Sequence, residues 1–95
     1  MDNKKYLDKV IGSLVRGTNI DYEKEKIYFS FIPSFFSYPS LSIRSSFSLL
    51  FSSITFLESF YHYCRDQFGL TWKEVDYVWD EYKSMMLDKI KNNEQ

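Results

Sequence analysis

A tight turn near the end of the chain, Gly69-Leu70-Thr71, constrains its fold more than any other feature. Thr71 is a typical helix N-cap, and Glu74 stands three residues later, where it completes a capping box. Gly69 stands where a helix commonly ends in a left-handed conformation. Because so short a turn leaves two flanking helices no room to separate, the sequence predicts a packed helical hairpin over residues 52–91.

Apolar residues at helical spacing support both arms of this hairpin. After the turn, the predicted buried stripe consists of Val75, Val78, Trp79, Tyr82, Met85, Met86 and Ile90. Before the turn, a second apolar stripe is predicted from residues spaced alternately by four and three: Ile43, Phe47, Leu50, Ile54, Leu57, Tyr61, Cys64 and Phe68. A helix is clearly favoured only from Ser52 onward, because serine and phenylalanine are mediocre helix formers.

The first 17 residues also predict a helix, with its apolar stripe at Leu7, Val10, Ile11, Leu14 and Val15. Asp2 or Asn3 is expected to cap its start, and Gly17 to end it in the left-handed conformation. Residues 18–26 are polar and predict a solvated connection. Alternation of Ile27, Phe29 and Phe31 then predicts a short strand over residues 27–32.

Residues 33–51 form a serine- and phenylalanine-rich tract for which three structures stay open: a loop, a short helix, or a strand pairing with residues 27–32. We therefore expect a mainly α fold in one domain of 95 residues. An N-terminal helix packs on the C-terminal helical hairpin, and the middle, residues 18–51, is irregular or contains a short β-hairpin.

Composition limits the classes of function. Aromatic residues make up 20% of the chain, enough either to fill a small core or to leave surplus rings on a sticky surface. The net charge of −1 provides no overall field for nucleic acid, so none is expected as a partner. The uncharged run over residues 27–43 contains Pro33 and Pro39 and does not predict a membrane-spanning helix. A single cysteine and the lack of a secretory pattern indicate a cytoplasmic protein.

Residues capable of catalysis are few. His62 and Cys64 are two positions apart, so on a helix they point to different faces and make a poor dyad. With one histidine and one cysteine, a structural zinc site lacks ligands, and the three glycines form no phosphate loop. The acids after the turn would also repel DNA from a helix-turn-helix. We therefore expect no enzymatic activity, no cofactor and no metal.

The remaining candidates are residues for contact with another protein. Trp79 is expected in the core, whereas Trp72 is either core or an exposed anchor. Nearby acids could meet a basic partner or simply face water. The apolar segment around residues 35–41 could dock on a partner, pack over the core or enter a membrane interface, although only Arg44 supplies a cation there. The candidate partner-binding residues are Trp72, Asp76, Asp80, Glu81, Phe35, Phe36 and Tyr38.

These observations suggest a small non-enzymatic protein-interaction module, with a membrane-interface protein as the alternative. Several segments resemble small proteins of marine cyanobacterial phages that have no assigned activity: Lys5-Tyr-Leu-Asp-Lys-Val, Ser13-Leu-Val-Arg, Ile20-Asp-Tyr-Glu-Lys, Phe68-Gly-Leu-Thr and Glu74-Val-Asp-Tyr-Val-Trp-Asp-Glu-Tyr. The resemblance covers the two ends of the chain and not its middle. It implies an accessory protein made in an infected host cell, acting on a host or viral protein, and it identifies no functional residues.

Overall fold

The fold is mainly helical, as predicted. A computed structural model of the chain describes residues 3–32, 35–36 and 42–93. Within these residues the elements are α1 (Lys4–Arg16), β1 (Thr18–Asp21), β2 (Lys26–Phe29), β3 (Phe35–Phe36), α2 (Ile43–Phe51), α3 (Ile54–Phe68) and α4 (Trp72–Asn93). The strands form an antiparallel sheet in the order β1-β2-β3.

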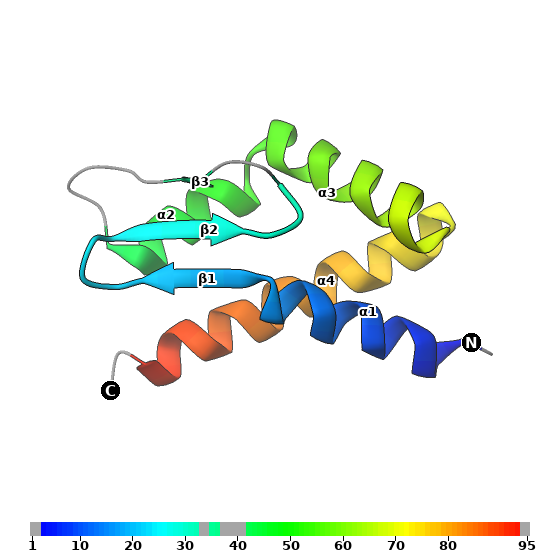
Figure 1. The fold of residues 1–95 in the computed structure, drawn as a ribbon, viewed down its shortest axis with the longest axis horizontal. Coiled ribbons are helices and arrows are strands. Elements are labelled where there is room, and N and C mark those ends of the chain that lie inside the picture. Colours follow the sequence, from blue (N-terminus) through cyan, green and yellow to red (C-terminus); the bar gives the residue numbers. More distant parts are fainter. Residues whose placement is uncertain (1–2, 33–34, 37–41, 94–95) are drawn as a thin grey trace.

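Helix α4 is the element on which the others assemble, because α1, α2 and α3 all contact it. It runs along much of the molecule, which measures 42 × 27 × 19 Å (Figure 1). The β1–β2 hairpin extends from the end of α1 and lies over the half of the molecule that contains α2 (Figure 1). The predicted packing of the N-terminal helix on the C-terminal hairpin is therefore confirmed.

The turn between α3 and α4 has the predicted chemistry. Gly69 adopts φ 64° in the left-handed region and ends α3. The Thr71 hydroxyl accepts from the Glu74 backbone N–H at 3.2 Å, and the Glu74 carboxylate accepts from the Thr71 N–H at 2.8 Å. The side chain of Asn3 also donates to Glu74 instead of capping α1. One carboxylate thus joins the starts of two helices.

Two predictions at the end of α1 are wrong. Gly17 ends the helix with φ −80°, outside the left-handed region. A Cβ at this position would lie 2.3 Å from the Ser30 Oγ, so the glycine allows close approach of the chain that follows β2. Residues 18–21 are also not a solvated connection but strand β1, whose first residue, Thr18, pairs with Phe29. Thr18 is buried, which explains why a polar segment becomes a strand.

The open tract contains both a strand and a helix. β3 pairs with β2, placing Phe35 opposite Tyr28 and Phe36 opposite Ile27. Helix α2 follows, whereas residues 33–34 and 37–41 lie outside the described residues. The predicted strand over 27–32 is β2, which covers Lys26–Phe29.

Serine caps divide the apolar series before the turn into two helices. The Ser42 hydroxyl accepts from the Ser45 N–H at 3.1 Å at the start of α2, and the Ser53 hydroxyl accepts from the Phe56 N–H at 3.3 Å at the start of α3. The break changes which residues of α3 face inward. Ile54, predicted to be buried, is 72% exposed, and the buried residues of α3 are Phe56, Phe60 and Cys64.

Aromatic rings fill much of the core, which favours the structural explanation of the unusual composition. The buried rings belong to Phe29, Phe31, Phe47, Phe56, Phe60, Trp79 and Tyr82. Most of them meet edge to face or tilted, as Phe60 does with Trp79 at 4.8 Å between centroids, and Trp79 and Tyr82 are stacked at 25°. Thr18 Oγ1 donates to the Leu14 carbonyl at 2.9 Å, so the Tyr82 hydroxyl, 2.7 Å away, donates to Thr18. The predicted stripe of α4 is buried except for Met85, which is 44% exposed.

Candidate protein-interaction surface

Trp72 is the first residue of α4 and is 55% exposed, which settles the open question of its position. The ring is nevertheless held on one side by α3. The Arg65 guanidinium lies 4.1 Å from the Trp72 ring centroid, and the Tyr61 ring lies 5.7 Å away at 31°. A cation over an aromatic face contributes about 0.5–1 kcal/mol at an exposed site. Trp72 is thus both accessible and oriented.

Two of the predicted acids lie on the same flank of α4. Asp76 accepts a hydrogen bond from the Tyr61 hydroxyl, and Asp80 is 3.8 Å from the Lys83 ammonium. Burial, followed by the hydrogen bond to Asp76 and the charges of Asp76 and Asp80, raises the pKa of Tyr61 to about 12. Tyr61 therefore remains a neutral donor at physiological pH. We call the surface formed by Tyr61, Arg65, Trp72, Asp76 and Asp80 the Trp72 face.

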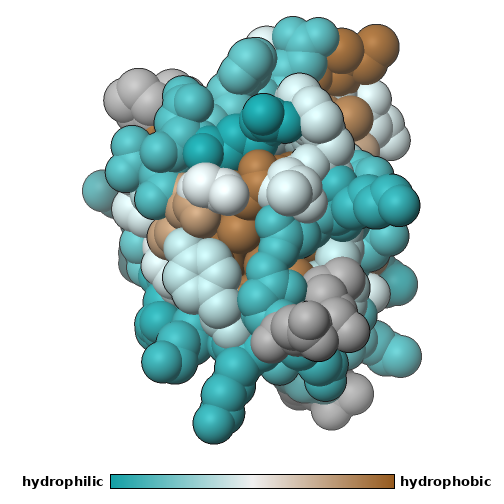
Figure 2. Space-filling view, turned by 90° about the vertical axis from the view of Figure 1, so that its right-hand side faces the viewer, coloured by the Kyte–Doolittle hydropathy of each residue, from teal (hydrophilic) through white to brown (hydrophobic). Residues whose placement is uncertain are grey.

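A shallow groove of about 630 Å³ continues this surface between α2 and α4. It is lined by Ser48, Phe51, Ser52, Asp80, Lys83, Ser84 and Leu87. Ile54 lies on the same stripe of α3 as Tyr61 and Arg65, seven and eleven residues before them in helical register. Figure 2 shows the end of the molecule with the α3–α4 turn, where a small hydrophobic area is surrounded by hydrophilic side chains.

The other candidate residues lie elsewhere. Glu81 faces the α1 side of α4, where it and Asp8 flank Tyr77, whose hydroxyl donates to Asp8 at 3.4 Å. Burial, followed by these two negative charges, raises the pKa of Tyr77. Phe35 and Phe36 belong to β3, over the α2 half of the molecule (Figure 1), and Tyr38 lies outside the described residues. The structure therefore groups Trp72 with Asp76 and Asp80 only.

Sequence reasoning missed Tyr61 and Arg65 as partners of Trp72. A signal was present, because an antiparallel hairpin brings residues just before its turn alongside residues just after it. Arg65 and Tyr61 are four residues apart and therefore share one face of α3. A tryptophan directly after the turn would be expected to meet that face.

Cys64 and His62, the candidates for catalysis, lie on different faces of α3. Cys64 is fully buried, and burial raises its pKa from 9.0 to about 12, which keeps it a thiol. His62 is exposed on another face of α3. Within residues 3–32, 35–36 and 42–93, His, Cys, Asp and Glu side chains form no group of three or more that could hold a metal ion. None of the helices in this part of the chain combines the length and apolar character that crossing a bilayer requires.

Comparisons with protein-family models, with curated proteins and with solved structures find no match to this chain.

Proposed function

We propose that this chain is a small non-enzymatic protein-interaction module whose contact surface is the Trp72 face. The observation that carries the proposal is that Trp72 is 55% exposed while Arg65 and Tyr61 hold its ring in place. Tryptophan, tyrosine and arginine are the residue types most enriched among interface hot spots. A ring that is already oriented also loses less conformational entropy on binding.

The chemistry of the face indicates what a partner would present. An apolar or aromatic side chain would cover the exposed side of the Trp72 ring, where desolvation is favourable. Asp80 is exposed and shares its one ion pair among the described residues with Lys83, so a basic group on the partner could approach it. Exposed charges of this kind contribute to orientation and association rate more than to affinity.

The sequence resemblance to small proteins of marine cyanobacterial phages supports a specific setting for this interaction. In that setting the chain is an accessory protein in the cytoplasm of an infected cell and binds a host or viral protein. A lysate of a phage-infected marine cyanobacterium is therefore the appropriate source of partners.

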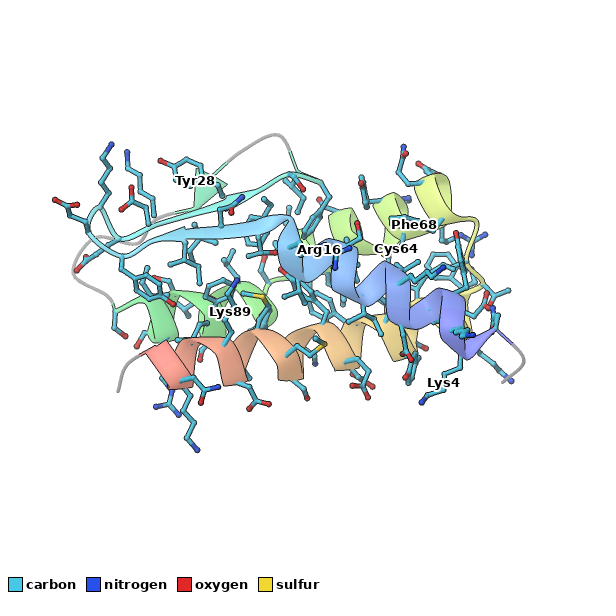
Figure 3. All side chains as sticks on the ribbon, turned by 60° about the horizontal axis from the view of Figure 1, so that its bottom comes forward. Lys4, Arg16, Tyr28, Cys64, Phe68 and Lys89 are labelled. Carbon is cyan, nitrogen blue, oxygen red and sulfur yellow. The ribbon has the colours of Figure 1, made fainter. Side chains whose placement is uncertain are left out.

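Affinity capture with three forms of the tagged chain tests the proposal: wild type, Trp72→Ala and Tyr28→Ala. Tyr28 is a matched control, because its ring is 40% exposed and projects outward from β2 (Figure 3). Loss of a hot-spot tryptophan costs about 2 kcal/mol or more, about 30-fold in affinity. Trp72→Ala should lose the captured protein and Tyr28→Ala should keep it. Equal retention by both variants contradicts the proposal.

The alternative function, association with a membrane interface, would use the sheet and the aromatic middle segment. Liposome flotation separates the two. The protein-interaction proposal expects the chain to stay with the soluble fraction. Flotation of the wild type that is abolished by Tyr28→Ala and unaffected by Trp72→Ala supports the alternative.

A further inference from the structure

The outward side of α1 carries a row of basic residues. Lys5, Lys9 and Arg16 are spaced by four and seven residues, which places them on one stripe, with Gly12 between them. All three cations are exposed, whereas the opposite side of the helix is buried against the core. We call Lys5, Lys9, Gly12 and Arg16 the α1 basic stripe.

The charges of this stripe have no partners in the described part of the chain. The ion pair found there joins Lys83 to Asp80 on α4, and none of Lys5, Lys9 and Arg16 makes a hydrogen bond or ion pair. Asp8, the acid of α1, is turned toward α4, where it accepts from the Tyr77 hydroxyl.

Folding stability does not explain the stripe. Lys4 and Lys5 stand in the first turn of α1, which contains no acidic residue, so both charges oppose the helix dipole. Like charges four residues apart, such as Lys5 and Lys9, also repel each other by about 0.2–0.5 kcal/mol. Figure 3 shows that the charged residues extend to both ends of the helix, where Lys4 and Arg16 are labelled. Lys5 and Lys9 are thus not placed to stabilise α1, whereas Arg16, in its last turn, is favourably placed for the helix dipole.

Gly12 leaves room for the Arg16 side chain on the same side of α1. A Cβ at Gly12 would lie 3.1 Å from Nη1 of Arg16, so the guanidinium packs over the glycine. Glycine in a helix interior costs about 1 kcal/mol relative to alanine. At this position it lets the Arg16 guanidinium lie close to the helix surface.

We infer that the α1 basic stripe binds a short acidic segment of another protein. From Lys5 to Arg16 the stripe is about 16 Å long, at 1.5 Å per residue. Beyond Arg16 the β1–β2 hairpin extends from the helix (Figure 1), and its turn, residues 22–25, has a net negative charge from Glu23 and Glu25 with Lys24 between them. A long polyanion such as nucleic acid would meet these acids, whereas a short segment with three or four carboxylates would not.

A membrane surface fits the stripe less well. Binding at a lipid interface combines cations with apolar side chains that enter the bilayer. The ring nearest the stripe, Tyr6, is held against the protein, because its hydroxyl donates to the Phe68 carbonyl at 3.0 Å. The inference goes beyond the proposed function, since the stripe is on α1 and the Trp72 face is on α3 and α4.

The test is an NMR titration of the ¹⁵N-labelled full chain at low salt with a short peptide that carries about four glutamates, a length matched to the stripe. Exposed ion pairs each contribute modestly to affinity, so neutralising three cations together should weaken binding by about 3-fold or more. The variant is Lys5→Gln, Lys9→Gln and Arg16→Gln combined. The control is Lys24→Gln, Lys73→Gln and Lys91→Gln combined, which removes equal charge from three exposed lysines elsewhere.

Shifts centred on the stripe residues, a loss of binding in the stripe variant and a change below about two-fold in the control support the inference. The thermal unfolding temperature of the stripe variant should change little, because relief of the Lys5–Lys9 repulsion offsets the loss of the Arg16 charge in the last turn of α1. Equal loss in both variants, or shifts confined to other elements, overturns it. Tighter binding of a single-stranded oligonucleotide of equal charge, or of phosphatidylserine vesicles, also overturns it by identifying a different ligand class.

Discussion

The buried contact between Tyr82 and Thr18 joins α4 to the start of β1, so its removal should measurably loosen the fold. In Tyr82→Phe the ring stays in place and one hydrogen bond to Thr18 Oγ1 is lost. Thr18 keeps its bond to the Leu14 carbonyl. A neutral hydrogen bond of this kind contributes about 1 kcal/mol net, so the free energy of unfolding should fall by about that amount.

Thr18→Val should cost more, because it leaves two groups without a partner. The Leu14 carbonyl loses its side-chain donor, and the Tyr82 hydroxyl loses its acceptor while its residue stays fully buried. An unsatisfied buried hydroxyl costs about 1–3 kcal/mol, so we expect a total of about 2–3 kcal/mol. In the double variant the unsatisfied hydroxyl is absent. The variant that combines Tyr82→Phe with Thr18→Val should therefore be no less stable than Thr18→Val alone, with a coupling energy of about 1 kcal/mol between the two positions.

Urea denaturation of the wild type, the two single variants and the double variant measures this cycle, with unchanged m-values as the check that the unfolding transition is comparable. Strictly additive losses would refute the reasoning. A larger loss in Tyr82→Phe than in Thr18→Val would do so as well.

Three further predictions concern the buried thiol and the α3–α4 turn. Burial raises the pKa of Cys64 in the folded chain, so the free energy of unfolding should be unaffected by this thiol below about pH 9 and should fall as pH rises above it, by roughly 1 kcal/mol per pH unit; urea unfolding of Cys64→Ala should lack this fall. Gly69→Ala should lower the free energy of unfolding by about 1 kcal/mol, because a φ of 64° disfavours any side chain even though no atom lies within 4 Å of the added Cβ. Thermal or urea unfolding measures this, and an unchanged stability contradicts it. The Thr71 backbone and then the Asn3 side chain lower the pKa of Glu74, so stability should be lost as pH falls below 4.5, and Glu74→Gln should flatten this part of the profile.

The α3–α4 turn could be predicted in detail because its signals are local. A left-handed glycine, a threonine cap and its glutamate partner lie within six residues, and each acts on its immediate neighbours. The position of α1 followed from apolar stripes at both ends of the chain.

The middle of the chain could not be predicted in the same way. In a tract so rich in serine, the two residues that cap helices, Ser42 and Ser53, look the same as those that do not. Strand β1 was missed because its evidence is tertiary. Thr18 is polar by sequence, and only its bonds to Leu14 and Tyr82 make it a core residue.

For the candidate site, the sequence indicated Trp72 as a possible anchor but not its exposure. That exposure depends on how α3 and α4 pack, since Arg65 and Tyr61 contact the ring while 55% of Trp72 stays exposed. Glu81 was grouped with Asp76 and Asp80 because all three are close in sequence. Helix α4 presents them on different flanks, and α1 packs against the flank that carries Glu81.

Acrylamide quenching of tryptophan fluorescence tests the proposed Trp72 face most directly, because the proposal requires that Trp72 is exposed and that Trp79 is buried. Trp79→Phe leaves Trp72 as the single emitter, and Trp72→Phe leaves Trp79, whose side chain is 6% exposed. The account predicts strong quenching and red-shifted emission for Trp72, with weak quenching and blue-shifted emission for Trp79. Equal quenching of the two emitters, or stronger quenching of Trp79, would contradict it.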